Sequence, residues 1–287
     1  MRLGDEVFVQ TLELLKRAKE GRYAVGGFNV WNLESALALL EAAEESSSPV
    51  VFNIQERVLK LFPSGALESF IQFLGKESRV PLTLNLDHGK TFEICAQCIH
   101  LGYQSVMMDG GALSLKENIA LTKKVVEYAH PNGVAVEGQV GEVSSSWAKE
   151  EGGKRTDPFE AQEFVRKTQV DLLAISIGTE SGLYEKEPVL DYHLTGEISR
   201  RTGAHLVLHG SSGLSGEAIR ECIKAGITHL RFGTDLHKAF FDGLRSREEE
   251  WECKGFNPQF ILPLTKEAIK EVLKEKLDQL GSTGKAN

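Results

Sequence analysis

The sequence predicts an α/β fold, a (β/α)8 TIM barrel with an additional C-terminal helix. Eight short apolar runs rich in β-branched residues alternate with longer amphipathic runs along the whole chain. Strands that alternate with helices in this way form parallel sheets joined by crossovers, and eight such units close naturally into a barrel. A doubly wound open sheet is the alternative, but it would usually contain fewer strands. The length suits one barrel, so residues 1–287 are predicted to form a single domain.

The predicted elements follow one another in order, each strand ahead of its helix. The eight strands cover residues 23–30, 49–55, 81–89, 105–110, 133–141, 171–178, 204–210 and 228–233. The helices that follow them cover residues 32–46, 65–76, 91–102, 114–130, 157–168, 191–203, 215–226 and 234–251, and a ninth covers 264–282. The residues predicted to cap helix N-termini are Asn32, Thr91, Asp157 and Ser215. The glycines predicted to end helices are Gly102, Gly203 and Gly226.

The longest irregular stretch, residues 141–158, lies between the fifth strand and its helix. Loops of this length are uncommon in a compact barrel, and they often serve as lids over a functional site. We therefore expect a mobile lid at this position.

The composition argues against several classes of function. A formal net charge of −8 disfavours general binding to nucleic acid or to a membrane surface, because both depend on basic patches. The N-terminus lacks the apolar core of a signal peptide, and no run of 18 apolar residues is present to span a membrane. Cys95 and Cys98 form a CxxC pair inside a predicted helix without a second pair, which indicates buried thiols rather than a zinc knuckle. The protein is expected to be cytoplasmic.

The predicted strands end in polar residues, at the end of the barrel where catalytic groups are usually found. Any one of these residues could be an ordinary cap or the start of a loop, but barrel geometry brings all the strand ends into one ring. The polar strand-end residues are Asn29, Gln55, Asp87, His88, Asp109, Glu137, Gln139, Thr179, His209 and Arg231.

The stretches "LNLDHGK" and "LVLHGSSGLS" contain two of these strand ends and resemble motifs of a known family. Together with "GGFN", "SVMMDG", "DLLAISIGT" and "GTDLHKAF", they resemble the class II fructose-bisphosphate and tagatose-bisphosphate aldolases over nearly the whole chain. The resemblance implies reversible cleavage of a ketose phosphate or bisphosphate to dihydroxyacetone phosphate and an aldehyde. In that family a zinc ion polarises the carbonyl and holds the enediolate oxygens, while an aspartate moves a proton at the hydroxyl of the aldehyde half.

The resemblance also assigns site residues at the matching positions. Asp87 matches the catalytic aspartate, Asp109 matches a supporting aspartate, and His88 and His209 match two metal-binding histidines. Backbone amides after the seventh and eighth strands are expected to bind phosphate, because loop amides that lead into a helix N-terminus form anion sites. The expected substrate- and phosphate-binding residues are Asn29, Gly182, Gly210, Ser211, Ser212, Gly213, Gly233 and Thr234.

Three positions depart from the family pattern. Ser181 stands where the motif after the sixth strand has a metal-binding histidine, Gln139 replaces a glutamate, and Arg231 replaces an asparagine of the eighth strand. A hydroxyl is a poor zinc ligand beside imidazole, and a guanidinium is always charged and repels a divalent cation. These changes predict weak zinc binding or none, and they make Arg231 a candidate catalytic residue in place of the metal.

Two mechanisms remain open at this point. In the first, zinc binds through His88, His209 and a third group such as Glu180, and the chain is a zinc aldolase. In the second, which is slightly favoured, Asp87 moves the proton and Arg231 stabilises the oxyanion without a metal. The second would also permit an isomerisation or other enediolate chemistry on a sugar phosphate. A non-catalytic sugar-phosphate sensor is a further alternative, which the retained aspartates and histidines disfavour.

The expected partner is a small sugar phosphate rather than nucleic acid or a membrane. Arg57 follows the second strand, where it could meet a second anionic group of the substrate or could simply be a solvated charge at the rim. The C-terminal helix resembles the family's intersubunit helix, so a homodimer or a higher homo-oligomer is expected.

Overall fold

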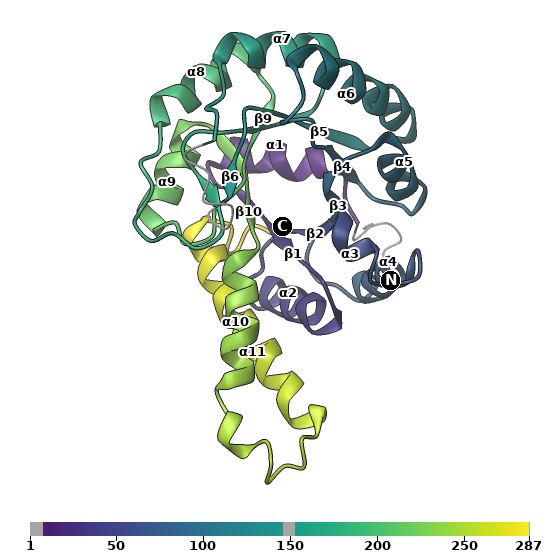
Figure 1. Ribbon diagram of the computed structural model, residues 1–287, viewed down its shortest axis with the longest axis vertical. Helices are drawn as coiled ribbons and strands as arrows, with labels where there is room; N and C mark the ends of the chain where they lie inside the picture. The colour runs from purple at the N-terminus through teal and green to yellow at the C-terminus, as the bar shows by residue number, and fades with distance from the viewer. Residues whose placement is uncertain (1–7, 146–152, 287) are drawn as a thin grey trace.

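Eight parallel strands close into a barrel in the structure, a computed structural model that describes residues 8–145 and 153–286 (Figure 1). Each strand pairs in parallel with both of its neighbours. The order around the barrel is β1 (Val25–Asn29), β10 (Ile227–Phe232), β9 (His205–Leu208), β7 (Leu172–Ile175), β5 (Ala135–Val140), β4 (Ser105–Met108), β3 (Leu82–Gly89) and β2 (Val50–Gln55). The predicted barrel is therefore confirmed, and the open-sheet alternative is wrong.

Helices surround the barrel and connect its strands (Figure 1). In chain order they are α2 (Leu33–Glu45), α4 (Ala66–Gly75), α5 (Phe92–His100), α6 (Leu115–Ala129), α7 (Pro158–Thr168), α8 (Tyr192–Thr202), α9 (Gly216–Ala225) and α10 (Thr234–Arg245). The four predicted N-cap side chains each accept a hydrogen bond from a backbone amide of the first helical turn. Gly203 and Gly226 end α8 and α9 in the left-handed conformation, and Gly102, directly after the C-cap residue Leu101 of α5, adopts the same conformation.

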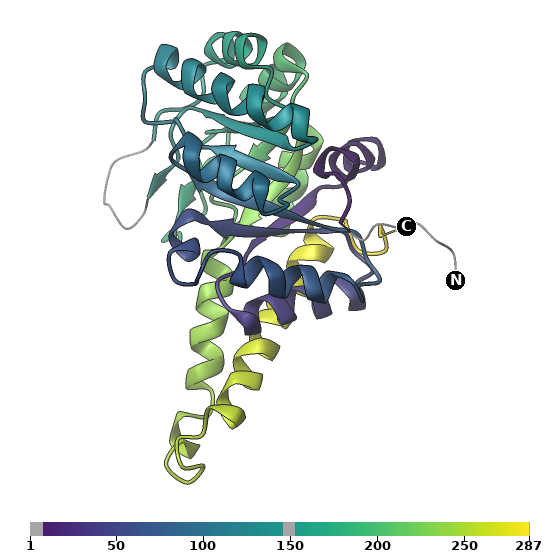
Figure 2. The ribbon, with the colours of Figure 1, turned by 90° about the vertical axis from the view of Figure 1, so that its right-hand side faces the viewer.

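The C-terminal region differs from the prediction. The helix expected to reach residue 251 ends at Arg245 and is followed by a short 3-10 helix, η2 (Glu248–Glu250). The last helix, α11 (Pro258–Gln279), begins earlier than predicted, because the Asn257 side chain accepts from the Gln259 amide and Pro258 occupies the first turn. Together α10, η2 and α11 form an arm that projects from the barrel (Figure 2).

The main apolar core lies between the strands and the surrounding helices. Side chains alternate along each strand, so every second residue faces this layer. Phe28 and Phe232, on neighbouring strands, are fully buried there and stack with ring centroids 5.4 Å apart. Burying a side chain of this size contributes roughly 1.5–3 kcal/mol. The remaining strand residues face the inside of the barrel and are available to build a site.

A second apolar cluster closes one end of the barrel. Helix α1 (Thr11–Gly21), which the sequence analysis did not predict, packs Leu14, Leu15 and Ala18 against inward-facing strand residues such as Val51 and Leu172. Figure 2 shows α1 at the end of the barrel opposite the loops that follow the strands. The described residues therefore close the barrel at its N-terminal end and leave it open at the C-terminal ends of the strands.

Polar side chains fill the middle of the barrel above this plug. Asn85 Nδ2 donates to Asn53 Oδ1 at 3.2 Å, and Ser105 Oγ donates to Asn85 Oδ1 at 2.7 Å. The buried His229 ring donates from Nδ1 to the Val25 carbonyl at 2.8 Å. A Cβ atom at Gly27 would lie 2.6 Å from this ring, so the glycine makes room for the histidine.

Two of the loops above the barrel pair with each other. Strand β6 (Ser144–Ser145), after β5, pairs in parallel with β8 (Glu180–Ser181), after β7. The predicted lid, residues 141–158, includes residues 146–152, which lie outside the described residues, and its role as a lid stays a prediction. The short helices α3 (Glu56–Leu59) and η1 (His130–Asn132) complete the fold and were not predicted.

The cysteine and membrane expectations can be compared directly with the structure. Cys95 and Cys98 are fully buried on α5 with free thiols, as predicted, and burial raises the pKa of Cys95 to about 12. Within the described residues, no helix is both long and apolar enough to cross a membrane.

The buried His229 should make the fold less stable in acid. Burial, helped by the nearby Arg231 charge, lowers the pKa of His229 from 6.5 to about 4. The unfolded chain takes up this proton between pH 6.5 and 4 while the folded chain does not, so stability falls as the pH falls through that window, by up to about 3 kcal/mol. Urea unfolding of His229→Asn, whose amide can replace the Nδ1 donor, should show a shallower loss of unfolding free energy. Parallel curves for the variant and the natural protein would contradict this account.

Candidate active site

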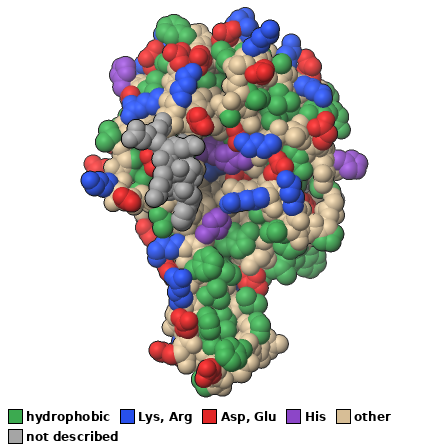
Figure 3. All heavy atoms as spheres, in the orientation of Figure 1, with side chains coloured by type: hydrophobic (Ala, Val, Ile, Leu, Met, Phe, Trp, Pro, Cys, Tyr) green, Lys and Arg blue, Asp and Glu red, His purple; other side chains and the backbone are tan. Residues whose placement is uncertain are grey.

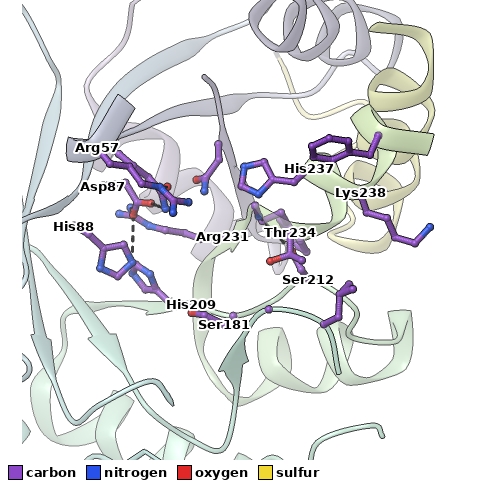
Figure 4. A pocket seen from close by; sticks show the side chains of 18 of the residues that line it. Arg57, Asp87, His88, Ser181, His209, Ser212, Arg231, Thr234, His237 and Lys238 are labelled. Atoms are coloured by element: carbon purple, nitrogen blue, oxygen red, sulfur yellow. Dashed lines mark hydrogen bonds and ion pairs between the residues drawn. The ribbon is translucent and has the colours of Figure 1, made fainter. Parts of the chain in front are cut away.

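A cavity of about 740 Å³ opens at the C-terminal ends of the strands. Histidine, lysine and arginine side chains surround the hollow at the centre of this face (Figure 3), and Figure 4 shows Asp87, His88, His209 and Arg231 pointing toward one another. Asp109, Glu180, Ser211 and Gly213 are predicted site residues that do not line the cavity. The predicted site residues that do line it are Asn29, Asp87, His88, Gly182, His209, Gly210, Ser212, Arg231, Gly233 and Thr234.

An irregularity in β3 brings two consecutive residues into the cavity. Asp87 occupies an inward-facing position opposite Gln55 of β2. The register between β3 and β4 then shifts after Leu86, and the next residue, His88, adopts a left-handed backbone with φ of 56°. A non-glycine residue in this conformation costs roughly 1–2 kcal/mol. Because the bulge redirects the chain, Asp87 and His88 both line the cavity instead of pointing to opposite faces.

The guanidinium of Arg231 lies at the floor of the cavity between two carboxylates. Its Nη1 contacts Asp87 and its Nη2 contacts Glu137, and all three side chains are buried. Gln55 donates from Nε2 to the other Asp87 oxygen at 3.2 Å, and His209 donates from Nε2 to the other Glu137 oxygen at 2.8 Å. Every carboxylate oxygen of Asp87 and Glu137 thus has a hydrogen-bond donor.

These contacts keep both acids ionised. Burial alone favours the neutral acid, but the neighbouring His88 and Arg231 charges outweigh it and hold the pKa of Asp87 well below its usual range. Burial likewise opposes ionisation of Glu137, yet Arg231 and the His209 hydrogen bond lower the pKa of Glu137. Each acid can therefore accept a proton but cannot donate one in the resting site.

The two histidines of the cavity are shifted in opposite directions. Burial disfavours the charged form of His88, but the carboxylates of Asp87 and Asp109 outweigh it and raise the pKa of His88. Burial lowers the pKa of His209, and the Arg231 charge adds to this effect. The rings meet edge to face with centroids 4.7 Å apart. His88 is therefore the histidine of this pair that more readily carries a positive charge.

Asp109 acts on the site through His88. The His88 Nδ1 donates to Asp109 Oδ2 at 2.7 Å, and Lys90 Nζ contacts the same oxygen at 2.6 Å. This hydrogen bond leaves His88 Nε2 to face the cavity, 4.0 Å from Asp87 Oδ1. Asp109 therefore fixes the orientation of the imidazole, which supports a positioning role, while a direct catalytic role stays a prediction.

Three residues of the cavity have the chemistry and spacing to hold a metal ion. The ligand atoms of Asp87, His88 and His209 lie within 4.8 Å of one another. Glu180, the third ligand considered from the sequence, is not part of this group, and its backbone amide donates to the Tyr184 hydroxyl at 2.9 Å. A ligand role for Glu180 therefore has no geometric support here and stays a prediction.

Ser181 and Gln139, the other two departures from the family pattern, differ in whether they line the cavity. Ser181 lines the cavity beside His209 and Gly182, at the position where the sequence resemblance implies a metal-binding histidine. Gln139 does not line it, and its amide nitrogen donates to the Gly141 carbonyl at 3.2 Å. The acid on the inner face of β5 that contacts the site is Glu137, two residues earlier. Its signal in the sequence was a charged residue in the middle of a buried strand.

The loops after β9 and β10 lie side by side at the N-terminus of α10. Ser212 Oγ accepts from the backbone amides of Gly233 and Asp235, each at 3.2 Å. Gly210 needs a left-handed backbone with φ of 67°, and a Cβ there would lie 2.5 Å from the Glu180 carbonyl oxygen. Amides at a helix N-terminus bind anions. Phosphate binding by these amides stays a prediction.

Ser211 and Gly213 stabilise the loop after β9 through hydrogen bonds to residues that do not line the cavity. Ser211 Oγ donates to the Leu208 carbonyl at 3.0 Å, and the Gly213 amide donates to Asp235 Oδ2 at 3.1 Å. Their predicted contact with phosphate stays untested.

Comparison with known proteins identifies the family. The sequence model described as "Fructose-bisphosphate aldolase class-II" matches residues 9–285. The chain belongs to the class II fructose-bisphosphate aldolase family.

The likeness extends over the barrel and the arm of this class II aldolase family member. The chain is 36% identical over 288 residues to a fructose-bisphosphate aldolase of Staphylococcus aureus, a match that covers 97% of this chain and 99% of the relative. It is 38% identical over 283 residues to a 6-phospho-5-dehydro-2-deoxy-D-gluconate aldolase of Bacillus licheniformis, covering 97% of each. The crystal structure of the YdjI aldolase from Escherichia coli K12 superposes with a TM-score of 0.87 at 29% identity, covering 98% of this chain and 100% of the other.

Removing the Arg231 charge should destabilise this family member more than an ordinary substitution does. Arg231→Met leaves Asp87 and Glu137 buried without their cation, and breaking a buried pair typically costs about 3–5 kcal/mol. Adding Glu137→Gln removes one of the stranded charges and should recover part of the loss. Urea unfolding measures both effects.

The matched control is Arg79→Met, which breaks the exposed pair with Glu44. It should change stability little, because solvent screens an exposed pair. An Arg231→Met variant as stable as Arg79→Met would mean that the buried ion pair is not what organises the site.

Proposed function

We propose that this protein is an aldehyde-lyase that reversibly cleaves a ketose phosphate to dihydroxyacetone phosphate, or a related enediolate, and an aldehyde. Asp87 serves as the proton shuttle, and Arg231 takes the place of the family's metal ion. The observation that supports this most is the guanidinium itself, which lies between Asp87 and Glu137 at the floor of a cavity that Ser212 and Thr234 also line (Figure 4).

The residues present do not fit a resident zinc ion well. Asp87, His88 and His209 supply enough donors by number, since catalytic zinc sites commonly have three protein ligands. The carboxylate charge that would attract the ion is already paired with Arg231, and Ser181 stands in the place of a histidine ligand. Perturbing a group behind the ligands typically costs about 10–100-fold in metal affinity, so losing a ligand should cost at least as much.

In this mechanism the cavity residues divide the reaction between them. Asp87 accepts the proton of the hydroxyl on the carbon that becomes the aldehyde. The adjacent carbon–carbon bond breaks, and its electron pair moves onto the ketose carbonyl to give an enediolate. The guanidinium of Arg231 stabilises the negative oxygen, a role that fixed donors perform best in a buried site. Its Nε–H has no hydrogen-bond partner among the described residues, so it retains donor capacity.

The phosphate fixes the direction of the substrate. Bound to the amides of Gly233 and Asp235 at the N-terminus of α10, it places the carbons of the dihydroxyacetone half over Arg231. The aldehyde half then extends past Asp87 toward the ends of β1 and β2. His88, held by Asp109, borders this path and adds positive charge beside Asp87.

One observation supports a second candidate. The cluster of Asp87, His88 and His209 is arranged as a metal site would be, which favours zinc-dependent chemistry as in other members of the family. A divalent ion there would require Arg231 to leave Asp87.

The decisive experiment combines metal analysis with turnover. Protein purified without added metal should contain far less than one zinc ion per chain. It should exchange a carbon-bound hydrogen of dihydroxyacetone phosphate with deuterium oxide, and it should do so equally well after treatment with EDTA. Cleavage should be assayed on a panel of ketose phosphates that includes the substrates named for the two relatives. Stoichiometric zinc with exchange that EDTA abolishes would establish the second candidate instead.

The same assay tests Arg231 without relying on an unstable variant. The double variant Arg231→Met/Glu137→Gln, once shown to be folded, should lose about 10²–10³-fold in exchange rate, the usual cost of removing an oxyanion donor. Arg79→Met should retain full exchange. Tight binding of sugar phosphates without exchange or cleavage by the natural protein would favour a sensor.

The proposal includes a homodimer or higher homo-oligomer assembled through the arm. Phe256 and Phe260, where α11 begins, are exposed to 63% and 54%. Exposed aromatic side chains on a projecting element often mark a protein contact. Light scattering should give at least twice the chain mass, and Phe260→Glu should lower it. A monomeric mass for the natural protein at micromolar concentration would contradict this part of the proposal.

A further inference from the structure

A second cavity, of about 450 Å³, adjoins the first on the side of β1 and β2. The two cavities are direct neighbours, because five residues line both. The shared residues are Asn29, Gln55, Arg57, His237 and Phe241. A molecule held over Arg231 and Asp87 therefore lies next to the second cavity, with Asn29 and Gln55 at the border between the two.

The walls of the second cavity are mostly apolar. Trp31 stands edge to face with His237 at 4.7 Å between ring centroids and with Phe240 at 6.0 Å. Leu61 and Phe241 lie at the rim and are exposed to 69% and 54%. Figure 3 shows hydrophobic side chains gathered next to the central hollow, where the arm leaves the barrel. Large exposed apolar side chains beside a catalytic cavity indicate a surface that a ligand covers.

The polar groups of this cavity are poorly suited to a second phosphate. Burial and the neighbouring Arg57 charge lower the pKa of His237, so the ring is neutral near pH 7. Arg57 is the one charged side chain among the described residues that line the cavity, and its Nε donates to Gln55 Oε1 at 2.7 Å. Gln55 in turn donates to Asp87. Arg57 therefore helps to orient Asp87 through Gln55, and a dianion here would lie against aromatic rings with a single cation to replace its water.

The position of this cavity matches the aldehyde half of the substrate. With phosphate at the end of β10 and the carbonyl over Arg231, the remaining carbons pass Asp87 and reach Asn29 and Gln55, which border both cavities. We propose that the second cavity binds the aldehyde half and that this half ends in an alkyl or aromatic group rather than a second phosphate. This inference rests on the proposed lyase function and adds the chemical class of the aldehyde.

The reaction run in the direction of condensation tests this inference. Dihydroxyacetone phosphate is combined with propanal, butanal, pentanal, hexanal and phenylacetaldehyde, and separately with glyceraldehyde 3-phosphate. Each methylene group enclosed should raise kcat/KM about fourfold, so hexanal should exceed propanal at least tenfold. Phenylacetaldehyde and hexanal should both exceed glyceraldehyde 3-phosphate. A flat series, or a preference for the phosphorylated aldehyde, would overturn the inference and would leave the apolar wall to a contact with another chain.

A substitution at the rim tests the role of the second cavity separately from that of the first. Leu61→Lys places a cation on the apolar wall, and since Leu61 is exposed and lines only the second cavity, the variant should fold normally. Its kcat/KM should fall at least fivefold for hexanal and rise for glyceraldehyde 3-phosphate. Leu113→Lys, another exposed leucine that lines neither cavity, is the control and should change neither value. Equal effects of the two substitutions would overturn the inference.

Hydrogen exchange of dihydroxyacetone phosphate alone tests the lyase function separately from the apolar aldehyde half, because exchange needs no aldehyde. Exchange by the natural protein without an apolar preference overturns the inference and leaves the lyase function intact. Absence of exchange overturns the lyase function and this inference with it.

Discussion

The buried contact of Arg231 with Asp87 and Glu137 is the interaction on which the rest of the active site depends. A charge inside a protein is tolerated only when its neighbours replace the hydration it has lost. Here each carboxylate oxygen meets a donor, from the guanidinium on one side and from Gln55 or His209 on the other. The positions of the two flanking residues follow from the need to satisfy the ion pair. A change at any of these five residues is therefore felt by the whole floor of the cavity.

The fold makes this arrangement possible by dividing the barrel interior into layers. Helix α1 seals the N-terminal end with an apolar plug, so the polar groups above it are enclosed on that side. The absence of a side chain at Gly27 makes room for His229, directly below the charged layer. At the open end, the bulge in β3 adds His88 to the cavity beside Asp87. The last two features use local backbone geometry to place a polar side chain that a regular strand could not place.

The sequence was sufficient for the barrel because the alternation of strands and helices is periodic and local. The same holds for the helix caps, since Asp157 or Ser215 needs only the next few residues to act. The partners of Arg231 could not be predicted in this way. Glu137 lies on β5, which is not a neighbour of β10, so the contact crosses the barrel and depends on the register of all the strands between them.

Strand register also explains why the expectations for Gln139 and Glu180 find less support than those for the other predicted site residues. Gln139 was singled out because it departs from the family pattern, but the inner position that meets Arg231 is two residues earlier on the same face. Glu180 was considered as a ligand because it adjoins Ser181. The pairing of β8 with β6 and the Tyr184 hydrogen bond instead fix that stretch through its backbone. The sequence showed which residue types are present, but it could not show how far along the barrel axis each one lies or which way its side chain points.

An arginine in this position differs from a metal ion in one respect that bears on the proposed mechanism. In the resting site the guanidinium holds the pKa of Asp87 low, which makes Asp87 a weak base. As the carbon–carbon bond breaks, negative charge develops on the enediolate oxygen and competes with Asp87 for the same guanidinium. Every step of that transfer makes Asp87 more basic, so its uptake of the proton and the stabilisation of the enediolate reinforce each other. In the proposed mechanism, the ion pair that makes Asp87 a weak base in the resting site thus couples proton transfer to bond cleavage.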